Sequence, residues 1–124
     1  MSEKVLYKDL SYNIVGCFYK VFNNLGPGHK EEIYHKALKI EFSIQNIKCD
    51  SKKRLKIEYE GKELGYYQPD FIIEDKVIIE IKSVLVMPKV FEKQLFYYLR
   101  ASNYRLGYLV NFGADKIEIK RRII

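Results

Sequence analysis

Three charged residues near the middle of the chain, Asp70, Glu80 and Lys82, have the types and the spacing to do chemistry together. Two apolar segments flank the polar triplet 74–76 between them, which predicts a β-hairpin. If the triplet is the loop, Asp70 lies opposite Glu80, and Lys82 shares their face because strand side chains alternate. A two-residue loop would place the carboxylates on opposite faces, since a one-residue slip turns a strand over.

The chemistry follows from where Glu80 would lie. Residues 77–81 are apolar on both faces except at Glu80, which is typical of a central strand covered on both sides. A buried carboxylate is costly unless it is paired, hydrogen-bonded or bound to a metal, and Asp70 nearby adds repulsion. A divalent cation removes that repulsion, and Mg²⁺ binds through one or two carboxylates, waters and phosphate oxygens. With Lys82 beside them, these groups suffice for metal-assisted phosphodiester hydrolysis.

The spacing alone is not specific, because the chain contains it more than once. Glu60 and Lys62 follow Asp50 at the same separations, and residues 118–120 repeat the Glu-Ile-Lys tripeptide. The first of these is a hydrophilic turn signal. The second has isoleucines on one face, which leaves its two charges in water. From pattern alone, an ordinary solvated strand face is the commoner explanation of Glu-x-Lys.

Pro69-Asp70 followed by Glu80-Ile81-Lys82 resembles the signature of the PD-(D/E)XK nucleases. The segment from Gly26 to Tyr34, Gly-Pro-Gly-His-Lys-Glu-Glu-Ile-Tyr, resembles the motif of the small GxxExxY-type family in that superfamily. The resemblance extends from the helix before Gly26 to the strand after Gly113. It implies an α/β, restriction-endonuclease-like fold, a mixed β-sheet flanked by helices in the order α-α-β-β-β-α-β-β, with nuclease activity.

The resemblance also implies roles for individual residues. Asp70 and Glu80 would bind Mg²⁺ or Mn²⁺, and the backbone carbonyl of Ile81 would add a ligand. Lys82 would orient the attacking water or stabilise developing charge. Glu31 would be a third acidic group at the metal site, although a first-turn carboxylate favoured by the helix dipole explains it equally well.

Two residues further along the chain complete the expected site. Gln94 is predicted to lie on an apolar helix face with Leu95 and Tyr98. The pair Gln94 and Tyr98 resembles the Gln-x-x-x-Tyr element of one branch of the superfamily, which implies that both lie near the scissile phosphate. The structural alternative is a core glutamine satisfied by backbone, with Tyr98 as packing.

Periodicity predicts the elements that would position these residues. Helices are expected at residues 9–24, 30–45 and 88–101, and strands at 54–59, 64–67, 71–73, 77–81, 105–111 and 116–123. The strand–helix–strand order after residue 77 predicts a parallel crossover. The last strand is expected to be an antiparallel edge.

Length and composition limit the broad class. The chain has 124 residues, 48% of them hydrophobic and 31% charged, which predicts one soluble domain spanning residues 1–124. No apolar run reaches the ~20 residues of a membrane span, and Met-Ser-Glu-Lys is not a signal peptide. Cys17 and Cys49 form no close pair, so we expect reduced thiols and a cytoplasmic protein.

The net charge of +6 suits a polyanionic partner. Many small soluble proteins are equally basic, so charge alone does not decide. The resemblance to the nucleases implies a nucleic acid, with DNA favoured, as the substrate. We expect no membrane partner and leave a homodimer open. The alternatives are a catalytically weak or inactive nucleic-acid-binding module that keeps the nuclease fold, and a protein-interaction domain in which the acidic cluster is a structural ion network.

Overall fold

The computed structural model describes residues 6–124. Its elements, in chain order, are α1 (Lys8–Leu25), α2 (Glu31–Ile44), β1 (Cys49–Ser51), β2 (Leu55–Tyr59), β3 (Lys62–Tyr67), β4 (Phe71–Ile73), β5 (Val77–Lys82), α3 (Val90–Ala101), β6 (Leu106–Asn111) and β7 (Glu118–Ile123). Every predicted helix and strand is present. The short strand β1 was not predicted. No helix of residues 6–124 is long and apolar enough to cross a membrane.

Five strands form a mixed sheet in the order β1-β4-β5-β6-β7. The pair β5–β6 is parallel and is connected through α3, whereas β1–β4, β4–β5 and β6–β7 are antiparallel. The predicted crossover and the predicted edge position of β7 are both confirmed. Strand β5 is central, and its four apolar residues are all buried because both of its faces are covered.

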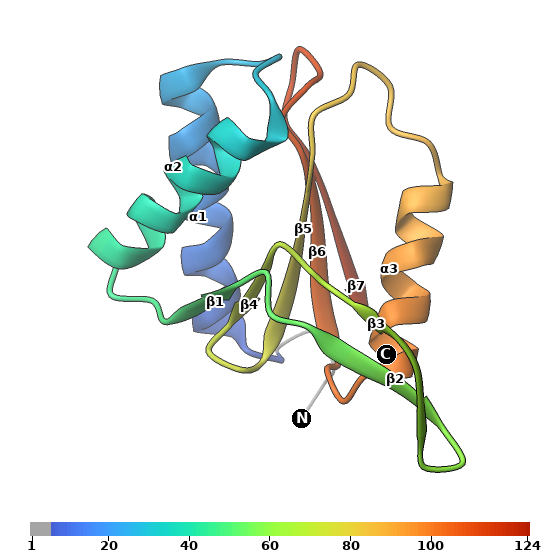
Figure 1. Cartoon of the computed structure of the whole chain (residues 1–124). Coiled ribbons are helices and arrows are strands. Elements are labelled where there is room, and N and C mark those ends of the chain that lie inside the picture. The colour runs from blue at the N-terminus through green and yellow to red at the C-terminus, as the bar shows by residue number, and fades with distance from the viewer. Residues whose placement is uncertain (1–5) are drawn as a thin grey trace.

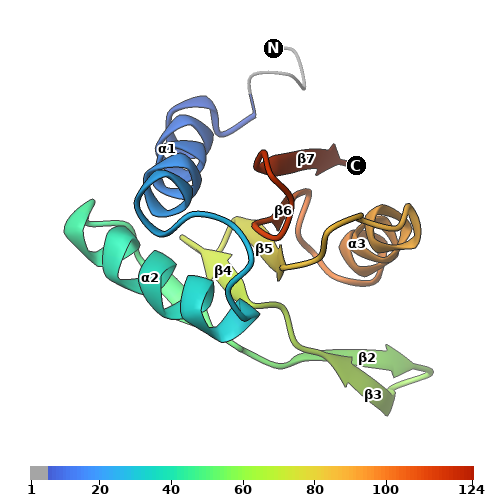
Figure 2. The ribbon, with the colours of Figure 1, turned by 90° about the horizontal axis from the view of Figure 1, so that it is seen from above.

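The sheet lies between two helical layers. Helices α1 and α2 cover one face and α3 covers the other (Figures 1 and 2). The larger core packs side chains of α1 and α2 against one face of the strands, with Phe18, Tyr34, Phe42, Phe71 and Ile79 among its buried members. The smaller core, on the α3 side, contains Tyr67, Ile78, Leu95, Leu99 and Leu109. Glu80 alternates with Ile79 and therefore faces the smaller core.

Strands β2 and β3 form a separate two-stranded sheet, which projects from the body of the molecule (Figures 1 and 2). The strands were predicted, but their separation from the main sheet was not. Glu60 and Gly61 have positive φ angles of 51° and 74°, so they form the expected turn. Glu60, which repeats the spacing of Glu80, therefore lies at the tip of the β2–β3 hairpin.

The β4–β5 hairpin has the three-residue loop. Phe71 pairs with Ile79 and Ile73 with Val77, which leaves residues 74–76 to connect the strands. Glu74 and Asp75 adopt positive φ angles of 52° and 55°, as a tight turn that matches the strand twist requires. Continued by one residue, this register places Asp70 opposite Glu80.

Candidate active site

Asp70 and Glu80 are joined by two reciprocal hydrogen bonds. The Asp70 backbone N–H donates to Glu80 Oε1 at 3.1 Å, and the Ile81 backbone N–H donates to Asp70 Oδ2 at 2.8 Å. Strand β4 begins only at Phe71, so the Asp70 side chain takes the place of a strand partner for Ile81. Both carboxylates are thereby fixed at the point where β4 and β5 separate.

The Ile81 carbonyl faces this same point. In a strand, the N–H and C=O of one residue point toward the same neighbouring strand. Because the Ile81 N–H reaches Asp70, its carbonyl lies on the Asp70 side of β5. The Ile81 side chain is 1% exposed and packs on the opposite side of the strand from Glu80.

Burial shapes the electrostatics of the pair. Removal from water, and after it repulsion from the Asp70 carboxylate, raises the pKa of Glu80 to about 7. Lys82 and the hydrogen bond from the Asp70 backbone act in the opposite direction. Near neutral pH this carboxyl group is therefore close to its titration midpoint, and a positive charge placed beside it would favour the ionised form.

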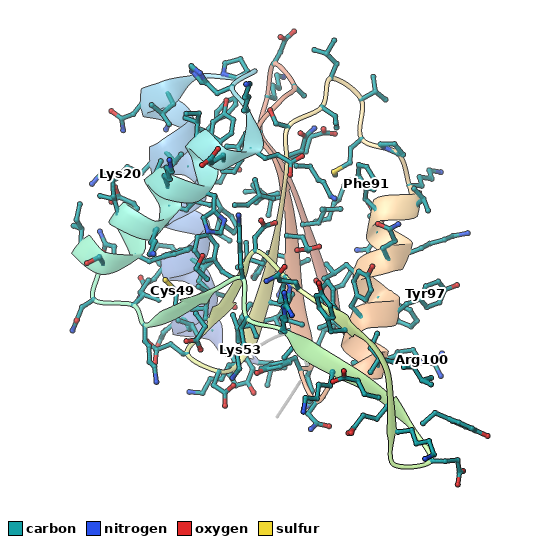
Figure 3. All side chains as sticks on the ribbon, in the orientation of Figure 1. Lys20, Cys49, Lys53, Phe91, Tyr97 and Arg100 are labelled. Carbon is teal, nitrogen blue, oxygen red and sulfur yellow. The ribbon has the colours of Figure 1, made fainter. Side chains whose placement is uncertain are left out.

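Lys82 stands two residues beyond Glu80 on the same face of β5 and is half-buried. Its Nζ lies 4.3 Å from the ring centroid of Phe91, in the first turn of α3, an arrangement that favours a cation over the aromatic face. Phe91 lies at the start of α3 (Figure 3). The lysine is therefore held between an aromatic ring and the acidic residues.

Glu31 is brought to the same cluster by the first turn of α2. Partial desolvation raises its pKa, Lys82 opposes this, and Asp70 raises it further, so all three charges interact. Both glutamates are exposed, but their partners differ, since Glu32 pairs with Lys36 at 3.2 Å on the helix surface whereas Glu31 interacts with Lys82 and Asp70.

The segment from Gly26 to Tyr34 holds Glu31 in place. The Tyr34 hydroxyl donates to the Gly26 carbonyl at 2.6 Å, and the His29 backbone N–H donates to that hydroxyl at 3.1 Å. The Tyr34 ring stacks on Phe112 at 4.3 Å, which follows β6. The hydroxyl at the end of the motif therefore closes the glycine-rich loop that precedes the acidic residue.

Asn111, which the sequence analysis did not select, braces the chain after Lys82. It is fully buried; its Oδ1 accepts from the backbone N–H groups of Val84 and Gly113, both at 3.0 Å. Its Nδ2 donates to the Val84 carbonyl at 2.9 Å and to Glu118 at 2.7 Å. Glu118 is therefore bonded to a buried partner, which corrects the prediction that it lies in water. A polar residue that ends an apolar strand was the available signal.

His35 was also missed. Its Nδ1 lies 3.5 Å from Asp70 Oδ1, its Nε2 lies 2.7 Å from the Ser51 hydroxyl, and its ring stacks on Phe71 at 4.2 Å. Burial lowers its pKa, and Asp70 opposes that effect. The available signal was helical spacing, since His35 follows Glu31 by four residues and shares its face.

Gln94 does not lie on the apolar face of α3 where the sequence analysis placed it, whereas Tyr98 does. Gln94 is exposed, so it is neither on the buried face of α3 nor a core glutamine. Tyr98 is half-buried and stacks on Tyr67 of β3, with ring centroids 3.6 Å apart. Tyr97 and Arg100 project from α3 away from the sheet (Figure 3). Tyr98 therefore reaches the acidic cluster through Tyr67, which interacts with Glu80.

The oxygen donors at this point are the Asp70 and Glu80 carboxylates and the Ile81 carbonyl. Within residues 6–124, no group of three or more His, Cys, Asp or Glu side chains lies close enough to hold a metal ion. The donor set fits Mg²⁺ or Mn²⁺ in the way such ions commonly bind, through one or two carboxylates with water and phosphate oxygens completing the shell. Burial, and after it repulsion from Asp70, raises the pKa of Glu80, and a cation bound between the two carboxylates would oppose both effects.

A groove of about 720 Å³ lies between β2, the β4–β5 turn and the loop after α3, and none of the acidic cluster lines it. Its lining includes Arg54, Lys56, Glu58, Asp75 and Tyr104. Its walls carry charges of both signs, so it has no clear preference for an anionic ligand. The acidic residues and Lys82 therefore remain the stronger candidate site.

Comparisons with known proteins agree with this geometry. The family model described as PD-(D/E)XK nuclease superfamily matches residues 8–122. The crystal structure of SSO0001 is similar to this chain, with a TM-score of 0.57 and 25% sequence identity, over 74% of this chain and 48% of that chain. This chain thus spans about half the length of SSO0001. No curated protein gave a significant match. The mixed sheet, its flanking helices and this neighbour together establish a restriction-endonuclease-like fold.

Proposed function

This chain belongs to the PD-(D/E)XK nuclease superfamily, and from that membership we propose that it is a divalent-metal-dependent nuclease. The substrate would be a nucleic acid, with DNA favoured, and the bond broken would be a phosphodiester. Within the superfamily we assign the chain to the GxxExxY-type family on the segment from Gly26 to Tyr34. We also propose a single domain over residues 1–124, acting in the cytoplasm, and keep a homodimer as a second state to be tested.

The observation that carries the proposal is the register of the β4–β5 hairpin. It sets Asp70 opposite Glu80, with Lys82 on the same face, at the one place in the central strand where apolar side chains give way to charge. The other copies of the spacing lack this setting. Glu60 lies in an exposed turn. Glu118 lies on the edge strand β7 and accepts a hydrogen bond from Asn111 of β6.

Each residue would have a distinct task. Asp70 and Glu80 would hold Mg²⁺ or Mn²⁺ together with the Ile81 carbonyl. The bound cation would act as a Lewis acid on the phosphate and lower the pKa of water. Lys82, steadied by Phe91, would orient the attacking water and stabilise the charge that develops on the phosphate oxygens.

Glu31 would support this centre as an accessory acid, because it already interacts with Lys82 and Asp70. Tyr98 would act through Tyr67. Gln94 is exposed on α3 and does not pack in the core, so it would contact a bound nucleic acid directly.

A second candidate is a nucleic-acid-binding module that keeps the fold with little activity. The reciprocal bonds from the Asp70 and Ile81 backbone N–H groups favour it, because they give both carboxylates partners without a cation. It predicts binding of nucleic acid that does not depend on Mg²⁺ and is unaffected by Glu80→Ala.

The test is a cleavage assay on supercoiled, linear and single-stranded DNA and on RNA, with Mg²⁺, with Mn²⁺ and with EDTA. Glu80→Ala is the test variant and Glu60→Ala, at the hairpin tip, is the matched control. The proposal predicts metal-dependent cleavage of at least one substrate, lost in Glu80→Ala and kept in Glu60→Ala. Binding without cleavage by the wild-type protein would favour the binding module.

A further inference from the structure

Tyr67 places a buried hydroxyl group beside Glu80 without a complete hydrogen bond. The residue is 7% exposed and belongs to the core on the α3 side of the sheet, the face that Glu80 shares. Its hydroxyl has no hydrogen-bond partner of good geometry within residues 6–124. Burial raises the pKa of Tyr67, and Glu80 raises it further through its charge and as an incipient hydrogen-bond acceptor, so the hydroxyl faces this carboxylate. A buried polar atom left in this state is costly.

The ring of Tyr67 is fixed from the other side. Tyr98 of α3 stacks on it with the planes 12° apart and the centroids separated by 3.6 Å. Tyr67 is also the last residue of β3 and stands three residues before Asp70. Its hydroxyl therefore cannot turn toward solvent without breaking the stack or moving the chain that leads into the site.

We propose that Tyr67 is a positioning residue for Glu80, donating its hydroxyl hydrogen to the carboxylate when Glu80 binds a divalent cation, with Tyr98 bracing the ring. This inference rests on the proposed function, because it concerns the same metal site. A donor to a ligating carboxylate fixes the orientation of that ligand, and losing such a partner typically lowers metal affinity about 10- to 100-fold.

The same geometry predicts an unusual pair of effects for Tyr67→Phe. In the metal-free protein the substitution should leave the free energy of unfolding unchanged or raise it, because removing an unsatisfied buried polar group is neutral or stabilising. In the presence of metal the hydroxyl is needed. A purely structural tyrosine would show the reverse: reduced stability without metal and an unchanged affinity for metal.

The experiment measures the affinity of Mn²⁺, as the metal alone, by isothermal titration calorimetry at a pH well above 7. Thermal unfolding in EDTA runs alongside. The proteins are wild type, Tyr67→Phe and Tyr66→Phe, the last a matched control because Tyr66 is the neighbouring, exposed tyrosine. Tyr98→Ala, a fourth protein, removes the ring that stacks on Tyr67.

The inference predicts that Tyr67→Phe and Tyr98→Ala bind Mn²⁺ at least about tenfold more weakly, while Tyr66→Phe matches wild type. Tyr67→Phe should unfold in EDTA at the wild-type temperature or above it. Equal affinity of Tyr67→Phe and wild type, or a clear loss of its metal-free stability, would overturn the inference alone. Absence of Mn²⁺ binding by the wild-type protein would overturn the proposed metal site and the inference with it.

Discussion

The backbone N–H of Asp70 donates a hydrogen bond to the carboxylate of Glu80 across 3.1 Å. The bond links the last residue before β4 to the charged position that interrupts the apolar residues 77–81 of β5. It is matched by the bond from Ile81 to the Asp70 carboxylate, so each acid is held by backbone on the opposite strand. The two carboxylates are therefore set in place before any ligand arrives, although their charges repel.

The bond to Ile81 makes Asp70 important for stability as well as for chemistry. Asp70→Ala removes the acceptor of a buried N–H and should lower the free energy of unfolding by about 1–3 kcal/mol. Asp70→Asn retains an acceptor for the Ile81 N–H and removes the repulsion on Glu80, so its free energy of unfolding should fall much less. Urea unfolding at pH 8 in EDTA measures both; an equal loss in the two variants would show that the hydrogen bond has no stabilising role.

The raised pKa of Glu80 predicts a pH-dependent stability. A carboxyl group whose pKa is higher in the folded state stabilises the fold at low pH, and this stabilisation is lost as the pH rises through the folded value of about 7. Relative to Glu80→Gln, which stays neutral, wild type should lose up to about 3 kcal/mol between pH 4.5 and pH 8. Unfolding of both proteins in EDTA across that range tests this; parallel pH profiles would contradict it.

Asn111 should be among the most sensitive polar residues of the fold. Asn111→Ala leaves buried backbone groups of Val84 and Gly113 without partners and should lower the free energy of unfolding by about 2–4 kcal/mol. Asn103→Ala, in the exposed loop after α3, should change it by less than about 0.5 kcal/mol. Denaturant unfolding measures the free energy of unfolding of both variants. Similarly small losses in the two would show that water replaces the hydrogen bonds of Asn111.

Gly113 is required by close backbone packing. A Cβ atom there would lie 2.2 Å from the Val84 backbone nitrogen and 2.5 Å from the Ser83 carbonyl carbon, so the chain after Lys82 must shift. Gly113→Ala should therefore lower stability by about 1–3 kcal/mol and reduce any cleavage. Gly65→Ala, where no atom lies within 4 Å, is the control. Wild-type stability in Gly113→Ala would show that the backbone at Ser83 and Val84 can move to accommodate the added Cβ at no cost.

The sequence predicted the centre of the site because short-range rules determine it. The loop at 74–76 and the alternation of strand side chains were enough to set Asp70 opposite Glu80, as the hairpin register confirms. Strand β1 could not be found in this way. Cys49–Ser51 has no periodicity of its own, and it becomes a strand only because it pairs with β4.

The supporting residues depend on contacts between distant parts of the chain. His35 meets Asp70, and Tyr67 meets Tyr98, only after α2 and α3 have packed on opposite faces of the sheet. The error on Gln94 has a related cause. Helix α3 packs through Leu95 and Leu99, and one residue step turns a helix by about 100°, so Gln94 falls outside the buried face.

The central claim is that Lys82 and the two carboxylates form the working centre of a nuclease. The most direct measurement is the single-turnover rate constant of cleavage, with Mn²⁺, for wild type, Lys82→Ala and Lys120→Ala. Lys120 is the matched control because it ends the other Glu-Ile-Lys tripeptide and is exposed on the edge strand. We predict a loss of about 10²–10³-fold in Lys82→Ala and wild-type rates in Lys120→Ala. Equal rates in the two lysine variants, or no cleavage of any DNA or RNA substrate by wild type, would contradict the account.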